Sequence, residues 1–301
     1  MLICQNDGSY EVSAPAKLNL FLEILGKRAD GYHELETLMV TVSLHDSLYF
    51  RVPETRGISL RNYWCGVQNA GLSGRDLPVG SQNLIVKAAE LLLQSTGTTQ
   101  GAQIDLFKRI PLAAGLAGGS SDAAAALVGL NQLWNLKLSP ADLREIGAKL
   151  GSDVPFFLAE SAAALCRGRG EIIESVKLPS VLHFVIAKPA VGLSTAQVFQ
   201  HCNPASVPKT AEGMVRSLQC GDLSGIAAQL MNRLGGPAER LCPELNELSK
   251  VFARLPVEGH LMSGSGTSYF GLCRHQQQAK HLAGRLTMLG LGSVYAVQTC
   301  I

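Results

Sequence analysis

Charge is scarce in this sequence. Asp, Glu, Lys and Arg make up 17% of the 301 residues, whereas an average globular domain has about a quarter. The net charge is +2 and no run is rich in Lys or Arg, so there is no electrostatic basis for a nucleic-acid-binding surface. No uninterrupted apolar stretch reaches the roughly 18 residues of a membrane-spanning helix. Because 47% of the residues are apolar, we expect a compact protein, long enough for two domains with separate cores.

Signals of export and of zinc binding are also missing. The N-terminal segment MLICQNDGSYEV has no basic stretch followed by an apolar one, so we expect no secretory signal. The eight cysteines form no C-x-x-C pair, which disfavours a zinc site. Free thiols in a reducing cytosol fit this pattern, and the sequence therefore predicts a cytoplasmic protein.

The clearest local signal is a glycine-containing loop that runs into a helix, PLAAGLAGGSSDAAAA at residues 111–126. An apolar, strand-like run precedes it, and an alanine-rich run predicts a helix over 120–134. Unpaired N–H groups and the helix dipole make such a helix start an anion site, most often for a polyphosphate. Glycines would let the backbone approach that anion, and they stand here at Gly115, Gly118 and Gly119.

This loop differs from two common phosphate-binding motifs. A Walker A loop ends in Gly-Lys-Ser/Thr, and no lysine follows Gly119. The glycine spacing also departs from the G-x-G-x-x-G dinucleotide fingerprint. Ser120 and Ser121 would cap the helix, or one of them would turn its hydroxyl toward a phosphate or its metal. An ordinary strand-to-helix turn with a serine cap is the alternative interpretation.

A lysine and an amide share one face of the first predicted strand, residues 12–25. Leucines alternate there with Lys17 and Asn19, which is typical of a half-buried strand. The pair would hold a phosphate oxygen if it faced a ligand. On a sheet edge it would be an ordinary solvent-facing pair.

Two aromatic residues stand directly behind the turn signal Asp30-Gly31. Tyr32 and His33 can stack on a planar ring and hydrogen-bond to it. The alternative is a hairpin that carries ordinary polar aromatics.

A single acid follows the helix predicted to begin at Pro140, after a Ser139 cap, and to end with Gly151 at its C′ position. Asp153 stands between that helix and the apolar run 154–157. A partly buried carboxylate is costly unless a cation pairs with it or a reaction uses it. Its alternative role is the N-cap of a short following helix.

Periodicity predicts the remaining elements. A helix opens at Asn83 and ends at Gly97, whereas residues 53–82 form an irregular insertion. The second half alternates strands with helices, which predicts an α+β sandwich. The expected strands are 37–44, 47–52, 102–110 and 181–189, and the expected helices are 210–219, 222–234, 237–254 and 275–289.

Five segments, in their order along the chain, resemble one family. PAKLN (15–19), ADGYH (29–33), GLAGGSSDAA (115–124), GSDVPFF (151–157) and MSGSG (262–266) look like motifs of the 4-diphosphocytidyl-2-C-methyl-D-erythritol kinases, within the GHMP kinase superfamily. The glycine loop and MSGSG are shared across the superfamily. ADGYH, GSDVPFF and the tripeptide that begins at Asn83 are more particular to this family.

The resemblance implies a fold and a reaction. The fold is α+β with two domains: an N-terminal ATP-binding domain over 1–165, like ribosomal protein S5, and a C-terminal substrate-side domain over 166–301, a ferredoxin-like sandwich. The family uses ATP and Mg²⁺ to phosphorylate a hydroxyl of the methylerythritol part of a cytidine diphosphate derivative. This step belongs to the non-mevalonate route to isoprenoid precursors. We expect a monomer or homodimer with a small-molecule substrate and neither nucleic acid nor membrane as partner.

The resemblance also assigns roles by position. Lys17 and Asp153 would flank the attacking hydroxyl, Asn83 would lie near adenine, and Ser121 or Ser120 would face the metal. The substrate side would comprise Asn19, Tyr32, His33, Thr195 and Phe199, with Tyr32 and His33 on the cytosine. The loop around the ATP phosphates would comprise Pro111, Leu112, Ala113, Ala114, Gly115, Leu116, Ala117, Gly118, Gly119, Ser120 and Ser121.

The sequence departs from the family pattern in places, and two rival interpretations stay open. Ala113, Ala114 and Ala117 stand where many members have glycine, which is tolerated if φ stays negative there. The insertion 53–82 is longer than the family pattern. The rivals are a kinase of the homoserine or mevalonate type, and a catalytically inactive relative that only binds a nucleotide.

Overall fold

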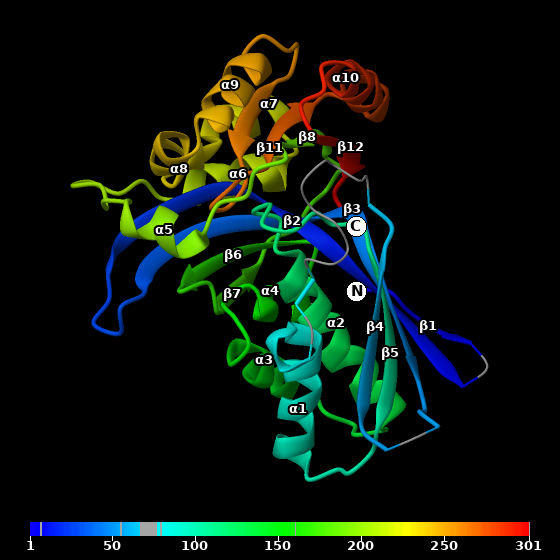
Figure 1. Cartoon of the computed structure of the whole chain (residues 1–301). Helices are drawn as coiled ribbons and strands as arrows, with labels where there is room; N and C mark the ends of the chain where they lie inside the picture. Colours follow the sequence, from blue (N-terminus) through cyan, green and yellow to red (C-terminus); the bar gives the residue numbers. More distant parts are fainter. Residues whose placement is uncertain (7, 55, 67–76, 79, 160, 301) are drawn as a thin grey trace.

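A computed structural model shows the chain as two β-sheets with helices packed against them (Figure 1), and it describes every residue except 7, 55, 67–76, 79, 160 and 301. The first sheet is built on two long antiparallel strands, β2 (Ser9–Lys27) and β3 (His33–Arg51), joined by a turn in which Gly31 has φ 85°. It also contains β1 (Ile3–Asn6), β4 (Ile58–Trp64), β5 (Ala102–Lys108), β6 (Ala163–Gly168), β7 (Ile172–Ser175) and the short β9 (Met231–Asn232).

Four helices cover one face of this sheet (Figure 1). Asn83 caps α1 by accepting a hydrogen bond from the Ile85 N–H at 2.9 Å, and Gly97 ends it in the left-handed conformation. Ser139 caps α3 in a reciprocal capping box. Both caps confirm the sequence prediction. The helices are α1 (Leu84–Thr96), α2 (Gly118–Leu133), α3 (Pro140–Ala148) and α4 (Val154–Leu158), and a short 3₁₀ turn, η2 (Gly80–Gln82), precedes α1.

The second sheet has the strand order β10-β11-β8-β12 and is antiparallel throughout. With its helices, this order is that of a ferredoxin-like β-α-β-β-α-β sandwich. The strands are β8 (His183–Lys188), β10 (Gly259–Met262), β11 (Tyr269–Cys273) and β12 (Ser293–Gln298). The helices are α5 (Thr195–Gln200), α6 (Glu212–Cys220), α7 (Leu223–Gln229), α8 (Gly235–Leu241), α9 (Pro243–Phe252) and α10 (Gln276–Met288).

The two sheets share a hydrophobic core. Leu18 and Leu20 of β2 belong to the same buried cluster as Phe184 of β8 and Phe270 of β11. An ion pair reinforces this junction, because the Glu23 carboxylate accepts two hydrogen bonds from the Arg233 guanidinium at 2.6 and 2.7 Å. The long strands of the first sheet are therefore fixed by residues of the second half.

Several predicted elements differ from the observed ones. The predicted strands 37–44 and 47–52 are one strand, β3, because a bulge opposite Pro15 and Ala16 bends it without ending it. The predicted helix 237–254 is two helices, because Pro243 begins a new one after Cys242 leaves the helical conformation. The predicted stop at Gly151 is wrong, since α3 ends with its C-cap at Lys149.

Other predictions bear on the chain as a whole. The predicted domain boundary after residue 165 falls inside β6, which pairs with β3, and the division into domains stays a prediction. Strand β4 lies within the predicted insertion 53–82, of which residues 67–76 are outside the described part. All eight cysteines are free. In the part of the chain that the structure describes, no helix has the length and apolarity to cross a membrane.

We predict opposite effects for two glycine-to-alanine changes inside helices. A Cβ on Gly129 of α2 would lie 2.3 Å from the Phe50 ring, whereas a Cβ on Gly284 of α10 meets nothing within 4 Å. Gly129→Ala should lower the free energy of unfolding by about 1–3 kcal/mol through overpacking. Gly284→Ala should raise it by about 0.5–1 kcal/mol through helix propensity. Urea denaturation measures both, and equal effects would contradict the packing of α2 on β3.

Candidate active site

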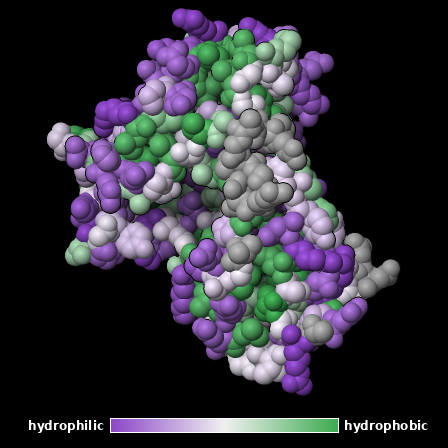
Figure 2. Space-filling model, viewed as in Figure 1, coloured by the Kyte–Doolittle hydropathy of each residue, from purple (hydrophilic) through white to green (hydrophobic). Residues whose placement is uncertain are grey.

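A cavity of about 1140 Å³ lies between the two halves of the chain, and Figure 2 shows the surface hollowed there. Its lining comes from β2, the glycine loop, the start of α4, the helix α5 and the loop between β10 and β11. These segments lie far apart in the sequence, and all of them except α5 contain a motif that carried the family resemblance. The predicted site residues in the lining are Lys17, Asn19, Tyr32, His33, Asn83, Pro111, Leu112, Ala113, Ala114, Gly115, Ala117, Gly118, Gly119, Ser120, Asp153, Thr195 and Phe199.

Lys17 and Asn19 are buried within this wall. The strand expected to be half-buried is covered on both faces, and Lys17 is 4% exposed and Asn19 2%. The Lys17 ammonium donates to the Asn19 side-chain oxygen, and the Asn19 amide donates to the Thr37 hydroxyl at 2.9 Å. The solvent-facing alternative for this pair is therefore excluded, and the amide fixes the direction of the ammonium.

Asp153 faces Lys17 across the cavity wall. Its Oδ2 lies 4.0 Å from Lys17 Nζ, and its side chain is 36% exposed. Burial lowers the pKa of Lys17, and the Asp153 carboxylate, with Cys166, opposes this shift. Asp153 therefore favours the charged form of Lys17 in this desolvated position.

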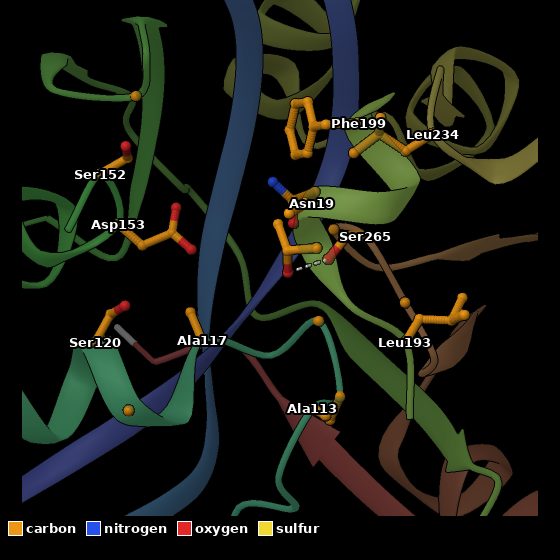
Figure 3. Close-up of a pocket in the computed structure, with 18 of the residues that line it drawn as sticks. Asn19, Ala113, Ala117, Ser120, Ser152, Asp153, Leu193, Phe199, Leu234 and Ser265 are labelled. Carbon is orange, nitrogen blue, oxygen red and sulfur yellow. Dashed lines mark hydrogen bonds between the residues drawn. The ribbon is translucent and has the colours of Figure 1, made fainter. Parts of the chain in front are cut away.

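The Asp153 carboxylate is free of the capping role considered from the sequence. Asp153 stands at the N-cap position of α4, but its side chain makes no capping hydrogen bond. Figure 3 shows the carboxylate pointing into the space between Ser120 on α2 and the opposite side, where Asn19 and Phe199 lie. A hydroxyl bound in that space would meet both the carboxylate and the Lys17 ammonium.

The glycine loop is locked to the loop between β10 and β11. Gly115 has φ 71°, and a Cβ there would lie 2.1 Å from the Ser263 carbonyl oxygen. The Ser263 hydroxyl donates to the Gly115 carbonyl at 3.0 Å, and the Lys17 N–H donates to the Leu116 carbonyl at 3.1 Å. The serine-glycine loop at 263–266 therefore packs directly against the glycine loop and holds it in position.

Two alanines in the glycine loop adopt the left-handed conformation. Ala113 has φ 47° and Ala117 has φ 53°, so the negative φ that would make alanine readily tolerated is not found at these two positions. Residues with a Cβ are strained there, and the contacts of neighbouring Gly115 and Leu116 hold the loop in place. Helix α2 begins immediately after Ala117, which directs its first N–H groups and its positive dipole end into the cavity.

Two predicted loop residues lie outside the cavity lining. Leu116 is 1% exposed and packs in the core shared by the two sheets. Ser121 is fully buried, and its hydroxyl has no hydrogen-bond partner among the described residues. Of the two serines at the helix start, Ser120 is the one that lines the cavity.

The far end of the cavity carries the predicted aromatic residues. The His33 and Phe199 rings lie 5.2 Å apart at 41°, and Tyr32 is 54% exposed. Burial lowers the pKa of His33, with a smaller contribution from Lys27. The Thr195 and Ser265 hydroxyls are hydrogen-bonded at 2.9 Å, a contact between α5 and the serine-glycine loop that the dashed line at Ser265 marks in Figure 3.

A buried charge cluster beneath the loop was missed in the sequence. Lys108, at the end of β5, contacts the carboxylates of Asp46 and Asp122, and both Lys108 and Asp122 line the cavity. Burial raises the pKa of Asp122 well above its ordinary value, against the effect of Lys108. Burial acts to lower the pKa of Lys108, but the two carboxylates outweigh it and raise that pKa. The available signal was Lys108 itself, which stands on the strand that leads into the glycine loop.

Comparison with known proteins finds one family. The sequence models described as GHMP kinases N terminal domain and GHMP kinases C terminal match residues 83–161 and 214–288. The 4-diphosphocytidyl-2-C-methyl-D-erythritol kinase of Pelotomaculum thermopropionicum is 46% identical over 274 residues, which cover 90% of this chain and 92% of that protein. The chain belongs to the 4-diphosphocytidyl-2-C-methyl-D-erythritol kinase family.

Another curated relative and two solved structures extend the match. The kinase of the same description from Shouchella clausii is 40% identical, over 96% of this chain and 94% of that protein. A crystal structure of 4-(cytidine 5'-diphospho)-2C-methyl-D-erythritol kinase is 35% identical, with a TM-score of 0.78 over 97% of this chain and 100% of that one. Homoserine kinase from Cytophaga hutchinsonii is 20% identical with a TM-score of 0.72, and it shares the fold alone.

Family membership confirms the predicted fold and enzyme class. The chain has the two-domain α+β fold of GHMP kinases. It is an ATP-dependent phosphotransferase of the 4-diphosphocytidyl-2-C-methyl-D-erythritol kinase family, which serves the non-mevalonate route to isoprenoid precursors.

We predict that the glycine loop tolerates a Cβ at one glycine and rejects it at another. Gly115→Ala places a methyl group against the Ser263 carbonyl in a left-handed conformation, and it should lower the free energy of unfolding by about 1–3 kcal/mol or more. Gly119→Ala is the matched control, because its nearest neighbour atom is 3.6 Å away. Thermal unfolding and ATP titration measure the difference, and equal stability of the two variants would refute the locked loop.

Proposed function

We propose that this chain transfers the γ-phosphoryl group of ATP to a hydroxyl of 4-diphosphocytidyl-2-C-methyl-D-erythritol. The observation that carries the proposal is the placement of Lys17 and Asp153, 4.0 Å apart, between two recognition ends of one cavity. One end has the glycine loop and the start of α2, which suit a triphosphate. The other has Tyr32, His33 and Phe199, which suit a planar base.

The chain's own residues supply the transfer chemistry. The hydroxyl oxygen forms a bond to the γ-phosphorus while the bond to the β-phosphate oxygen breaks, and ADP leaves with that electron pair. Asp153 accepts a hydrogen bond from the hydroxyl and is positioned to take its proton. Lys17, loop N–H groups and the α2 dipole stabilise the charge that spreads over the phosphoryl oxygens. Asn19 keeps the Lys17 ammonium oriented through its side-chain oxygen.

Oxygen donors suited to Mg²⁺ are present beside the loop. Mg²⁺ uses one or two protein oxygens together with phosphates and water, so it needs no cluster of three protein ligands, and among the described residues no such cluster of His, Cys, Asp or Glu is found. Asp122 lines the cavity, and its Oδ1 is buried and has no hydrogen-bond partner in the described part of the chain. Ser120 lines it too, and these two residues would hold the ion. Bound Mg²⁺ neutralises phosphate charge.

Activity against three alcohols tests this function. Release of ADP should require 4-diphosphocytidyl-2-C-methyl-D-erythritol, and homoserine and mevalonate should give none, because neither fills the aromatic end. Turnover of homoserine or mevalonate in place of the cytidine compound would overturn the proposal. ATP binding without turnover of any of the three would identify an inactive nucleotide-binding relative.

We predict that Asp153→Ala lowers kcat by roughly 10²–10⁴-fold while ATP still binds, since a positioned proton acceptor contributes about that much. The fold should survive, because this side chain makes no capping bond. Asp142→Ala is the control: it removes a capping box from α3, so it should lower stability by about 0.5–2 kcal/mol and leave kcat near that of the wild type. Normal turnover in Asp153→Ala would remove this residue from the mechanism.

A further inference from the structure

The proposed substrate carries a diphosphate between its base and the alcohol that reacts. When cytosine lies at Tyr32 and the alcohol at Asp153, the diphosphate lies along the wall that joins these two points. Two negative phosphates in a half-enclosed cavity require positive partners to replace water. The wall should therefore contain a cation that is not already neutralised.

Four cationic side chains line the cavity within the described part of the chain: Lys17, Lys27, Lys108 and Arg169. Lys17 is engaged with Asn19 and Asp153, and Lys108 contacts two carboxylates. Among the described residues Arg169 makes one ion pair, with Glu171, whose carboxylate is 3.9 Å from its guanidinium, and its charge also acts on the Asp30 carboxylate. Arg169 therefore retains donors for an anion.

Arg169 also stands at the required place. Its guanidinium carbon lies 4.8 Å from the centroid of the Tyr32 ring. Its neighbour Gly170 packs on the backbone beside Asp153, since a Cβ there would lie 3.4 Å from the Ser152 carbonyl oxygen. The residue therefore spans the interval between the base end and the reacting end.

Two glycines and one hydrogen bond shape the turn that carries Arg169. Gly168 has φ 74° and Gly170 has φ 121°, so the sequence Gly-Arg-Gly folds sharply between β6 and β7. The Glu171 carboxylate accepts a hydrogen bond from the Arg169 N–H at 2.6 Å. This contact fixes the backbone and leaves the guanidinium, whose side chain is 33% exposed, at the cavity wall.

We infer that Arg169 is the residue that binds the diphosphate of the cytidine substrate, with its guanidinium stacked on Tyr32 and donating to phosphate oxygens. This inference rests on the proposed function. Planar guanidinium groups bind phosphate oxygens in pairs and stack on aromatic rings at the same time. Lys27 also lines the cavity and adds positive charge there. It lies at the end of β2, where it pairs in register with His33 of β3.

Affinities for cytidine and CDP test this role, because the two probes differ only in the diphosphate. Wild-type protein should bind CDP more tightly than cytidine. Arg169→Gln should weaken CDP binding by about 10-fold or more, the loss expected for charge-assisted hydrogen bonds, and leave cytidine binding nearly unchanged. The KM for the cytidine substrate should rise in parallel, while kcat and the KM for ATP stay within about threefold. Arg169→Lys should restore part of the CDP affinity, since it keeps the charge without the fork.

Two control variants separate this role from others. His33→Ala should weaken cytidine and CDP by the same factor, because it acts on the base. Arg167→Gln removes a cation from β6, close to Arg169 in the sequence. The Arg167 side chain pairs with Glu36 and Glu174, and Arg167 is not among the residues that line the cavity. This change should leave the affinities for cytidine and CDP unchanged.

Each remaining outcome decides against the inference. If Arg169→Gln and Arg169→Lys weaken cytidine as much as CDP, Arg169 acts only by supporting Tyr32. If neither affinity changes, it has no substrate role. If the wild-type protein turns over the cytidine substrate, either of these two results overturns the role of Arg169 and leaves the proposed function standing. If the wild-type protein neither binds CDP nor turns over that substrate, the proposed function and the role of Arg169 both fail.

Discussion

The site depends on one close backbone approach. The glycine loop from the first half of the chain and the serine-glycine loop from the second half meet where Gly115 leaves no room for a side chain beside Ser263. The same contact ties the loop to β2 through the Leu116 carbonyl and the Lys17 N–H. The glycine loop, the strand that carries Lys17 and the ferredoxin-like half are thus held together, and all three contribute to the cavity lining.

Buried charge gives that cavity its chemical character. Lys17, Lys108 and Glu23 are all nearly inaccessible to solvent, and each is matched by polar or opposite charges. Such groups are costly to bury unless they are paired, and in a desolvated site they act strongly on nearby phosphate groups. Two of them lie in the cavity wall, and the third fixes the strand that carries Lys17 to the second half. Stability and phosphoryl transfer therefore draw on the same buried ionic contacts.

Local chemistry predicted much of the fold, and long-range packing accounts for the errors. Asn83, Gly97 and Ser139 act as the caps that their residue types predict, because capping depends on the neighbouring few residues. The single long strand β3 was predicted as two, since a bulge is absorbed by pairing with β2, a partner that periodicity does not reveal. The left-handed Ala113 and Ala117 escaped prediction for a similar reason: contacts from distant segments impose conformations that alanine alone disfavours.

The sequence by itself determined the family, the glycine loop, and the residue types that face each other in the cavity. These three conclusions depend on the order and spacing of short motifs, which are visible in the sequence alone. Only the tertiary structure decided that Lys17 is buried against Asn19 and Asp153, that Ser120 rather than Ser121 reaches the cavity, and that Arg169 lies over Tyr32. The physical reason is that burial, side-chain direction and contact across more than a hundred residues arise from how the two sheets pack together.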